Sequence, residues 1–194
     1  MRALHEIDSG IGELDALTTG QARVQVGNFY LDLGRFDDAR LHLSKGRELL
    51  RTVGEQQEKG LDALRALGVI DYSSGEVERA IEQLTSAREG FIKVFGSTSP
   101  DAQGASYWLA AALADTGRIE EADELIANLQ PDALRTSLGG KGWAVRLDAL
   151  RAKVLIRQGR TEEGQTLLTA SIPQLERDGV PSWLIDSLKT LAQE

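Results

Sequence analysis

The sequence of 194 residues contains no cysteine, only 5% aromatic residues, four prolines and one methionine. Without a thiol, the chain offers no disulfide, no thiolate nucleophile and no cysteine-ligated metal. It also contains no stretch near 18 apolar residues, and its first ten residues, "MRALHEIDSG", lack the apolar segment of a secretory signal. We therefore expect a soluble, cytoplasmic protein without a membrane partner.

Basic residues are also under-represented. The chain has 22 Lys and Arg against 30 Asp and Glu, a net charge of -8 and an isoelectric point near 4.9. A domain that gains affinity by neutralising phosphates is basic along at least one face, so nucleic acid is not an expected partner of this domain. The two histidines, His5 and His42, lack the spacing of metal ligands, and we expect neither a metal nor a cofactor.

Catalytic motifs are missing as well. "GIG" at 10–12 has no third glycine and follows no strand pattern, so it is not a dinucleotide-binding turn. "GGKGW" at 139–143 lacks the first glycine of a phosphate loop and the Ser or Thr that follows its lysine. No Gly-x-Ser-x-Gly nucleophile turn occurs. The sequence therefore predicts a protein that is not an enzyme.

What the sequence does contain is a repeat. Four similar segments begin with glycine: "GRFDDARLHL" at 34–43, "GEVERAIEQL" at 75–84, "GRIEEADELI" at 117–126 and "GRTEEGQTLL" at 159–168. The glycines are 41, 42 and 42 residues apart, a regularity typical of stacked helical arrays. We expect each glycine to adopt a positive φ between two helices, and the acids after it to complement the dipole of the second helix.

Small residues flank every turn glycine at fixed distances. Five residues after it stand Ala39, Ala80, Ala122 and Gly164, and seven residues before it stand Gly27, Gly68, Ala110 and Ala152. This pattern predicts two antiparallel helices that approach closely. Larger residues at helical spacing are the expected core: Val26, Tyr30, Leu43, Leu64, Leu67, Leu84, Leu109, Leu113, Ile126, Leu155 and Leu168.

The expected fold is all-α, a superhelix of stacked antiparallel helix hairpins that forms one domain over 1–194. An N-terminal helix over 3–17, within 1–18, precedes four hairpins near 20–53, 55–95, 99–129 and 141–177, which together span 20–177. A helix over 182–192, within 180–194, caps the array. The stretch 129–140 breaks the regularity with a brief extra turn at 132–138 and a glycine joint, and it is either a hinge or an irregular rigid connection.

The segments "VGNFYLDLGRFDDA" at 26–39 and "LGVIDYSSGEVERA" at 67–80 resemble the tetratricopeptide repeat. The period matches its longer kinesin-light-chain-like variant, and the segment over 91–122 is the most similar piece. Asp71 stands where an aromatic residue is common, and Arg151 stands where leucine is expected. The resemblance implies a right-handed superhelix and a non-catalytic scaffold that binds a protein or peptide in its concave groove. It also implies the regulatory part of a larger bacterial signalling protein.

The resemblance also implies which side chains face that groove. Its first-helix offsets select the candidate binding residues Asn28, Arg65, Tyr72, Tyr107, Trp108, Arg146, Lys153 and Arg157. Asn28 and some of the basic residues match the offsets of peptide-clamping relatives, but the full clamp pattern is absent. The same offsets also select Asp62.

Two groups among these candidates leave alternatives open. Arg146, Lys153 and Arg157 share one helix face by their spacing, and they either meet acidic groups of a partner or pair with acids on neighbouring helices. Tyr107 and Trp108 point about 100° apart on a helix, so we expect one in the core and the other in the groove. Trp143 and Trp183 are expected to be packing and capping residues.

Two other functions are compatible with the sequence. The first is a sensor, in which the groove closes on a peptide or a small molecule and the pitch of the superhelix changes. The second is a self-association module that uses an apolar face of the first or last helix. The scaffold is the preferred function of the three, and the sensor and the self-association module are the alternatives.

Overall fold

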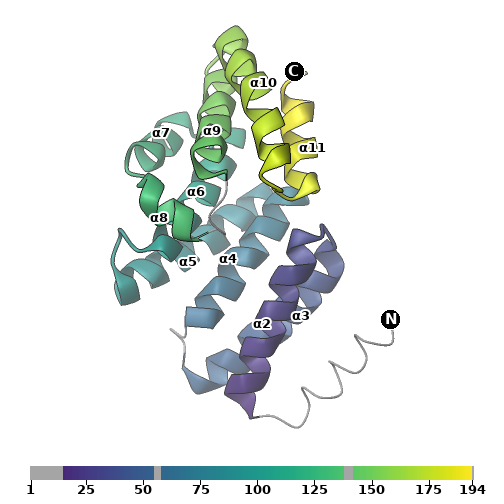
Figure 1. Ribbon diagram of the computed structural model, residues 1–194. Helices are drawn as coiled ribbons and strands as arrows, with labels where there is room; N and C mark the ends of the chain where they lie inside the picture. Colours follow the sequence, from purple (N-terminus) through teal and green to yellow (C-terminus); the bar gives the residue numbers. More distant parts are fainter. Residues whose placement is uncertain (1–14, 55–57, 138–141, 194) are drawn as a thin grey trace.

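The computed structural model describes residues 15–54, 58–137 and 142–193 of the chain. This part consists of ten α-helices and contains no strand (Figure 1). The helices are α2 (Ala16–Asp32), α3 (Phe36–Val53), α4 (Glu58–Ser73), α5 (Val77–Phe95), α6 (Pro100–Asp115), α7 (Ile119–Ala127), α8 (Pro131–Ser137), α9 (Trp143–Arg157), α10 (Thr161–Arg177) and α11 (Ser182–Leu191). The prediction of an all-α array of helix hairpins is confirmed.

The four turn glycines join the two helices of each hairpin as expected. Gly34, Gly75, Gly117 and Gly159 have φ angles of 70°, 83°, 77° and 82°. In the first turn the Arg35 amide donates to the Tyr30 carbonyl at 2.9 Å, and the same bond recurs after each of the other glycines. This is the Schellman arrangement, which satisfies the last carbonyls of the first helix.

The small residues beside the turns allow the paired helices to touch. A Cβ atom built on Gly27 would lie 2.6 Å from Leu43 Cγ, and one built on Gly68 would lie 2.8 Å from Leu84 Cγ. Ala122 is fully buried where α7 crosses α6. The predicted close approach is therefore present. Most of the predicted core is buried, whereas Val26, Leu64 and Leu155 are only half-buried.

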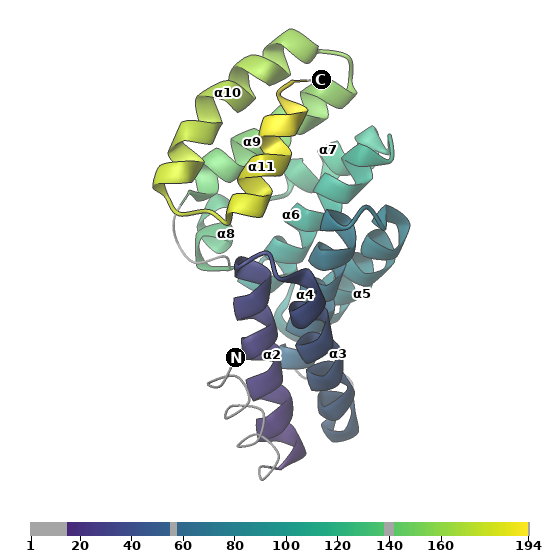
Figure 2. The same cartoon turned by 90° about the vertical axis from the view of Figure 1, so that its right-hand side faces the viewer.

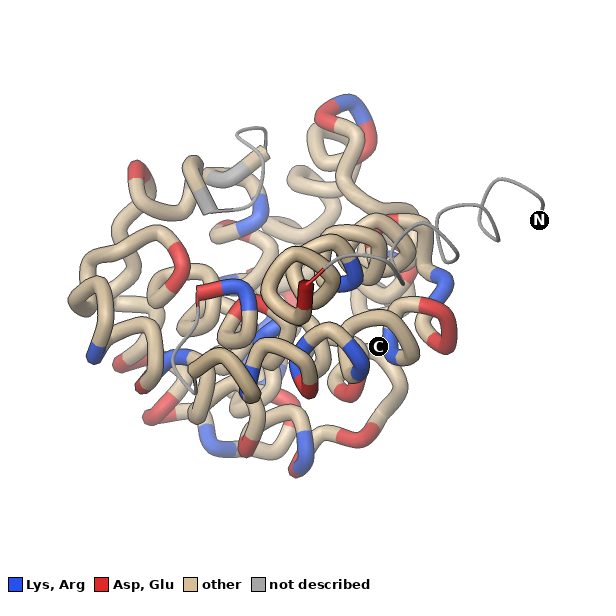
Figure 3. Tube along the Cα trace, turned by 90° about the horizontal axis from the view of Figure 1, so that it is seen from below, with Lys and Arg blue, Asp and Glu red and all other residues tan. Residues whose placement is uncertain are grey.

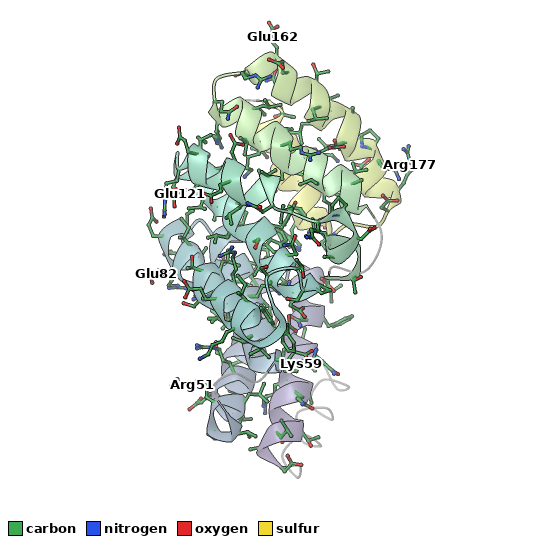
Figure 4. The ribbon with its side chains drawn as sticks, turned by 90° about the vertical axis from the view of Figure 1, so that its left-hand side faces the viewer. Arg51, Lys59, Glu82, Glu121, Glu162 and Arg177 are labelled. Atoms are coloured by element: carbon green, nitrogen blue, oxygen red, sulfur yellow. The ribbon has the colours of Figure 1, made fainter. Side chains whose placement is uncertain are left out.

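The first helices of the hairpins form one layer and the second helices form another. We call the surface of α2, α4, α6 and α9 the groove face, and we call α3, α5, α7 and α10 the outer layer. Glu82, Glu121 and Glu162 on the outer layer are exposed and point away from the body (Figure 4). After α10 the chain turns back, so that the beginning of α11 lies at the end of α2 (Figure 2).

The N-terminal boundary differs from the prediction. The predicted helix over 3–17 falls mostly on residues 1–14, which lie outside the described part of the chain, and its last residues belong to α2. Asp15 is the N-cap of α2, because its carboxylate accepts a hydrogen bond from the Thr18 amide at 3.0 Å. The first hairpin thus begins at Ala16, four residues earlier than predicted, since this cap ends one helical pattern and starts the next.

The third hairpin is irregular where the sequence predicted a break. Helix α7 has only 9 residues, whereas α3 has 18 and α5 has 19. The short helix α8 occupies the place of the predicted extra turn, and both Leu129 and Leu134 are buried. The Gln130 amide donates to Gln103 Oε1 at 2.6 Å. The glycine joint at 139–140 lies outside the described residues.

Asp71, the residue that departs from the repeat pattern, is fully buried between three helices. Arg79 donates to its two oxygens at 2.7 and 2.6 Å, Gln83 donates at 2.8 Å, and Arg40 also pairs with it. Burial opposes ionisation, but the bonds from Arg79 and Arg40 outweigh it and lower the pKa of Asp71. A buried carboxylate therefore replaces an aromatic ring in joining α3, α4 and α5.

Candidate functional site

The groove face brings together residues from all four hairpins around two cavities. Six of the eight candidates line them. A cavity of about 300 Å³ is lined by Asn28, Arg65, Trp108 and Arg146 among others. A second cavity, of about 380 Å³, is lined by Tyr72 and Lys153 together with Phe36 and Asp115. The remaining candidates, Tyr107 and Arg157, contact these residues without lining either cavity.

In the first cavity, Asp62 organises two of the candidates. Its carboxylate accepts a hydrogen bond from Asn28 Nδ2 at 2.9 Å and forms a close ion pair with Arg65. The side chains of Asp62 and Arg65 are each only 12% exposed. Burial alone would raise the pKa of Asp62, but Arg65 and the bond from Asn28 lower it below its ordinary value. Asn28 and Arg65 are thus held in place by an acid of this chain.

Arg146 lies under the same cavity and is 7% exposed. Its guanidinium carbon is 5.5 Å from the ring centroid of Tyr107 and 5.6 Å from that of Trp108, so both rings stabilise its charge. The Tyr107 hydroxyl donates to the Arg146 carbonyl at 3.4 Å. Trp108 lines the cavity, whereas Tyr107 packs beneath it against α9.

In the second cavity, Asp115 is the central group. Lys153 Nζ donates to Asp115 Oδ2 at 2.6 Å, the Tyr72 hydroxyl donates to the same oxygen at 2.7 Å, and Arg157 pairs with Oδ1 at 3.2 Å. Lys153 also donates to the Tyr72 hydroxyl. Burial opposes ionisation of Asp115, but Lys153, Tyr72 and Arg157 lower its pKa. Burial and Asp115 raise the pKa of Tyr72 well above its ordinary value, so the hydroxyl keeps its proton.

The basic face predicted on α9 is therefore engaged with the protein itself. Lys153 and Arg157 pair with Asp115 of α6, and Arg151 pairs with Asp148 of its own helix at 3.2 Å. Pairing with neighbouring acids was one of the two alternatives for this face, and for Lys153 and Arg157 the structure has that arrangement. Viewed from below, acidic and basic residues are interspersed along the trace (Figure 3).

Sequence reasoning missed Trp183, which the structure places between the two cavities and in the lining of both. Its ring stacks on Trp108 with centroids 6.0 Å apart and meets the Phe36 ring edge-on at 5.5 Å. Its Nε1 donates to the Leu31 carbonyl at 3.0 Å, across 152 residues of sequence. The side chain was expected to cap the C-terminal end of the array, whereas the structure places it against Leu31 and Phe36 of the first hairpin.

Sequence reasoning also missed Asp115, although a signal was present. Asp32, Ser73, Asp115 and Arg157 all stand two residues before a turn glycine. Opposite charges at the same offset in consecutive repeats, such as Asp115 and Arg157, are placed to pair across neighbouring first helices. Comparing the four repeats by offset, position by position, would have predicted this ion pair.

The chemistry available on the groove face consists of aromatic surfaces, guanidinium and ammonium groups, and carboxylates. Within the described ranges, no group of three or more His, Cys, Asp or Glu side chains is placed to hold a metal ion. No helix in the same ranges is long and apolar enough to cross a lipid bilayer. These groups are suited to binding another molecule by stacking and hydrogen bonding.

Comparison with known proteins finds a family match for part of the repeat. Residues 103–128 and 145–168 match the family model of the tetratricopeptide repeat. The second of these segments contains Arg151, whose side chain is exposed where the pattern expects leucine. No curated protein matches the chain by sequence.

Two crystal structures of nearly identical TPR-like repeats from a Podosopora anserina putative kinesin light chain have a similar fold. The first has a TM-score of 0.61 at 17% identity, over 85% of this chain and 78% of that one. The second has a TM-score of 0.59 at 18% identity, over 80% of this chain and 74% of that one. The predicted resemblance and the solenoid architecture are both confirmed.

Proposed function

We propose that this chain, two segments of which match the tetratricopeptide repeat, is a non-catalytic scaffold that binds a protein or peptide partner on its groove face. The proposal includes a single domain over 1–194, a cytoplasmic location and a role as the regulatory part of a larger bacterial signalling protein. Such repeats generally serve as protein-interaction scaffolds. The observation that carries the proposal is the gathering of side chains from four hairpins around two cavities on one face.

The partner's affinity would come mainly from aromatic contact. The Trp183 ring stacks on Trp108, which is only 4% exposed, and lines both cavities, while Tyr72 lines the second cavity, so Trp183 and Tyr72 supply the accessible aromatic surface. Aromatic anchors bury large areas and dominate many interfaces. Asn28 and Arg65 are held by Asp62, and Lys153 is held by Asp115, so these polar groups occupy fixed positions in the cavity linings.

The test needs a substitution that changes the groove face without breaking its ion pairs. Reversing the charge of Arg65 or Lys153 would place two like charges in a half-buried site and would test folding instead. Asp32 is exposed and lines the first cavity, so Asp32→Lys alters the cavity mouth, and because the new cation lies near Arg146 and Arg65, the urea midpoint of this variant is measured before capture. Glu82→Lys makes the same charge change on the outer layer and is the matched control (Figure 4).

Affinity capture from native extract, read by mass spectrometry, then compares the three proteins. We expect at least one partner that wild type and Glu82→Lys retain and that Asp32→Lys loses, with the purified partner showing the same order in a titration. Equal capture by all three proteins, or loss with Glu82→Lys alone, would move the binding surface away from the groove face.

The sensor is a second candidate because both cavities have the size of small-ligand sites, at about 380 and 300 Å³. If the chain is a sensor, we expect a bound ligand to change the distance between the first and fourth hairpins. Small-angle X-ray scattering with and without the captured ligand distinguishes the two functions, since a scaffold keeps its radius of gyration and a sensor changes it.

A further inference from the structure

Trp183 is the one side chain in the described ranges that lines both groove cavities. Pro181, just before α11, lines the first cavity, and Ser187 on α11 lines the second. Tyr72 and Trp108 are in ring contact beneath it, so the two cavities are neighbours on one surface. The beginning of α11 therefore divides a groove that the four hairpins form as one.

The residues that contact the Trp183 ring belong to the first and third hairpins, and we call them the seat of Trp183. The Leu31 carbonyl accepts its Nε1–H, the Phe36 ring meets its edge, and Trp108 of α6 stacks on its face. A Cβ atom on Gly34 would lie 3.4 Å from Trp183 Cδ1, so the turn glycine also bounds the seat. These contacts join the last helix of the array to its first hairpin.

The attachment of α11 to its own end of the array uses a different set of side chains. Leu184, Ile185, Leu188 and Leu191 are buried in the main core. The groove side of α11 instead presents Trp183 and Ser187, four residues apart on one face of the helix. A single large side chain thus closes the groove, while four apolar residues hold the helix independently of it. Trp183 can leave its seat without detaching α11.

From this geometry we infer that Trp183 is a latch that determines which ligands the groove face admits. While Trp183 is seated, the face offers two separate cavities, each suited to one side chain or one small molecule. An extended peptide that contacts both cavities enters only when Trp183 leaves its seat. The inference rests on the proposed function of the groove face and deepens it by naming the residue that sets ligand size.

The absence of native cysteine allows a direct test of access. Ser73 is half-buried and lines the second cavity beside Trp183, whereas Ser74 is exposed and outside it. Ser73→Cys is introduced into the wild-type chain and into the Trp183→Ala variant. Alkylation of the new cysteine is then measured with a small reagent, iodoacetamide, and with a bulky one, fluorescein maleimide. Ser74→Cys in both backgrounds is the matched control and corrects for the intrinsic reactivity of each reagent.

We expect Trp183→Ala to increase the corrected alkylation rate of Ser73→Cys with the bulky reagent at least about tenfold. With Trp183 present, the cavity is open for only a small fraction of the time, and the alkylation rate is lowered in proportion to that fraction. The rate with iodoacetamide should change less than about twofold, since the closed cavity already admits small molecules. Trp183→Phe keeps the ring but loses the hydrogen bond to Leu31, and an intermediate rate is expected. Should Trp183→Ala fail to fold by circular dichroism, Trp183→Phe carries the test.

The latch is ruled out if the bulky reagent reacts at the wild-type rate in the folded variants. This outcome is distinct from failure of the proposed function, since alkylation of Ser73→Cys requires no partner. Conversely, a chain that captures no partner can still show the expected difference in rate. In that case the inference about Trp183 stands, whereas the proposed scaffold function fails.

Discussion

The outer layer and the groove face carry the same types of ion pair in different surroundings. At the outer turns, an arginine pairs with the acid three residues later, and every partner is at least 43% exposed: Arg35–Asp38, Arg118–Glu121 and Arg160–Glu163. On the groove face, Lys153 and Asp115 are only 14% and 19% exposed, and their pair joins α9 to α6. The outer pairs each lie within one helical turn and are exposed to water, whereas the Lys153–Asp115 pair links two repeats.

The difference matters because exposure sets the energy of an ion pair. Exposed pairs contribute little, since water screens them and long side chains lose entropy. A half-buried pair that loses one partner leaves a poorly solvated charge behind. We therefore expect the groove-face pairs to fix the stacking of neighbouring repeats and the outer pairs to contribute mainly to the local helix start.

The largest expected effect is that of Asp115→Ala. Removing the carboxylate leaves Lys153 and Arg157 facing each other near Tyr72, and the free energy of unfolding should fall by about 3 kcal/mol. Urea unfolding followed by circular dichroism measures it. The double variant Asp115→Leu/Lys153→Met should recover part of this loss, because it removes the more buried of the two cations, whereas Arg157, at 32% exposed, is better solvated. A loss below about 0.5 kcal/mol would place this pair in the same class as exposed ones.

A second substitution tests the contact between the two layers. Ala122 is fully buried where α7 meets α6, so Ala122→Leu should separate the third hairpin and lower stability by about 2 kcal/mol. Thermal and urea unfolding provide the measurement, with Ala127→Leu, at an exposed position of the same helix, as the control. An unchanged urea midpoint would contradict the close approach of α6 and α7.

The buried carboxylates also predict the pH dependence of stability. The pKa values of Asp62, Asp71 and Asp115 are held below the ordinary value of 3.8, so these groups stabilise the folded state fully above pH 3.8. The contribution is lost as the pH falls below 3.8 through the lowered values. Urea midpoints at pH 7 and pH 5 should agree, and the midpoint at pH 3 should be lower. Asp115→Asn should show a smaller decrease between pH 5 and pH 3.

The smallest expected effect is that of Glu121→Gln on the outer layer. Both partners of the Arg118–Glu121 pair are about half exposed, and their contact lies within one turn. We expect no measurable change in the urea midpoint, in contrast to Asp115→Ala. A change as large as that of the groove-face variant would remove the distinction between the two layers.

The architecture could be predicted because it depends on local and periodic features. The turn glycines require a positive φ, and the small residues at fixed offsets permit close helix contact, so both appear directly in the sequence. The boundary at Asp15 was missed because residues 16 and 17 were assigned to the end of the predicted helix over 3–17, whereas the Asp15 carboxylate caps the helix that begins at Ala16. The offsets of the candidate groove residues came from the resemblance to the tetratricopeptide repeat, and six of the eight side chains that they select line the two cavities.

The tertiary structure alone decided how the side chains of that face are paired. Asn28 meets Asp62 across 34 residues, Lys153 meets Asp115 across 38 residues, and Trp183 meets Leu31 across 152 residues. Each of these contacts depends on how successive repeats are rotated relative to one another. These rotations are set by the helix contacts between repeats, and they add up along the array. The sequence by itself therefore determined an all-α solenoid of helix hairpins with close helix contacts at each turn. The contact of Trp183 with the first hairpin was decided only by the tertiary structure, because it depends on the accumulated curvature of the whole array.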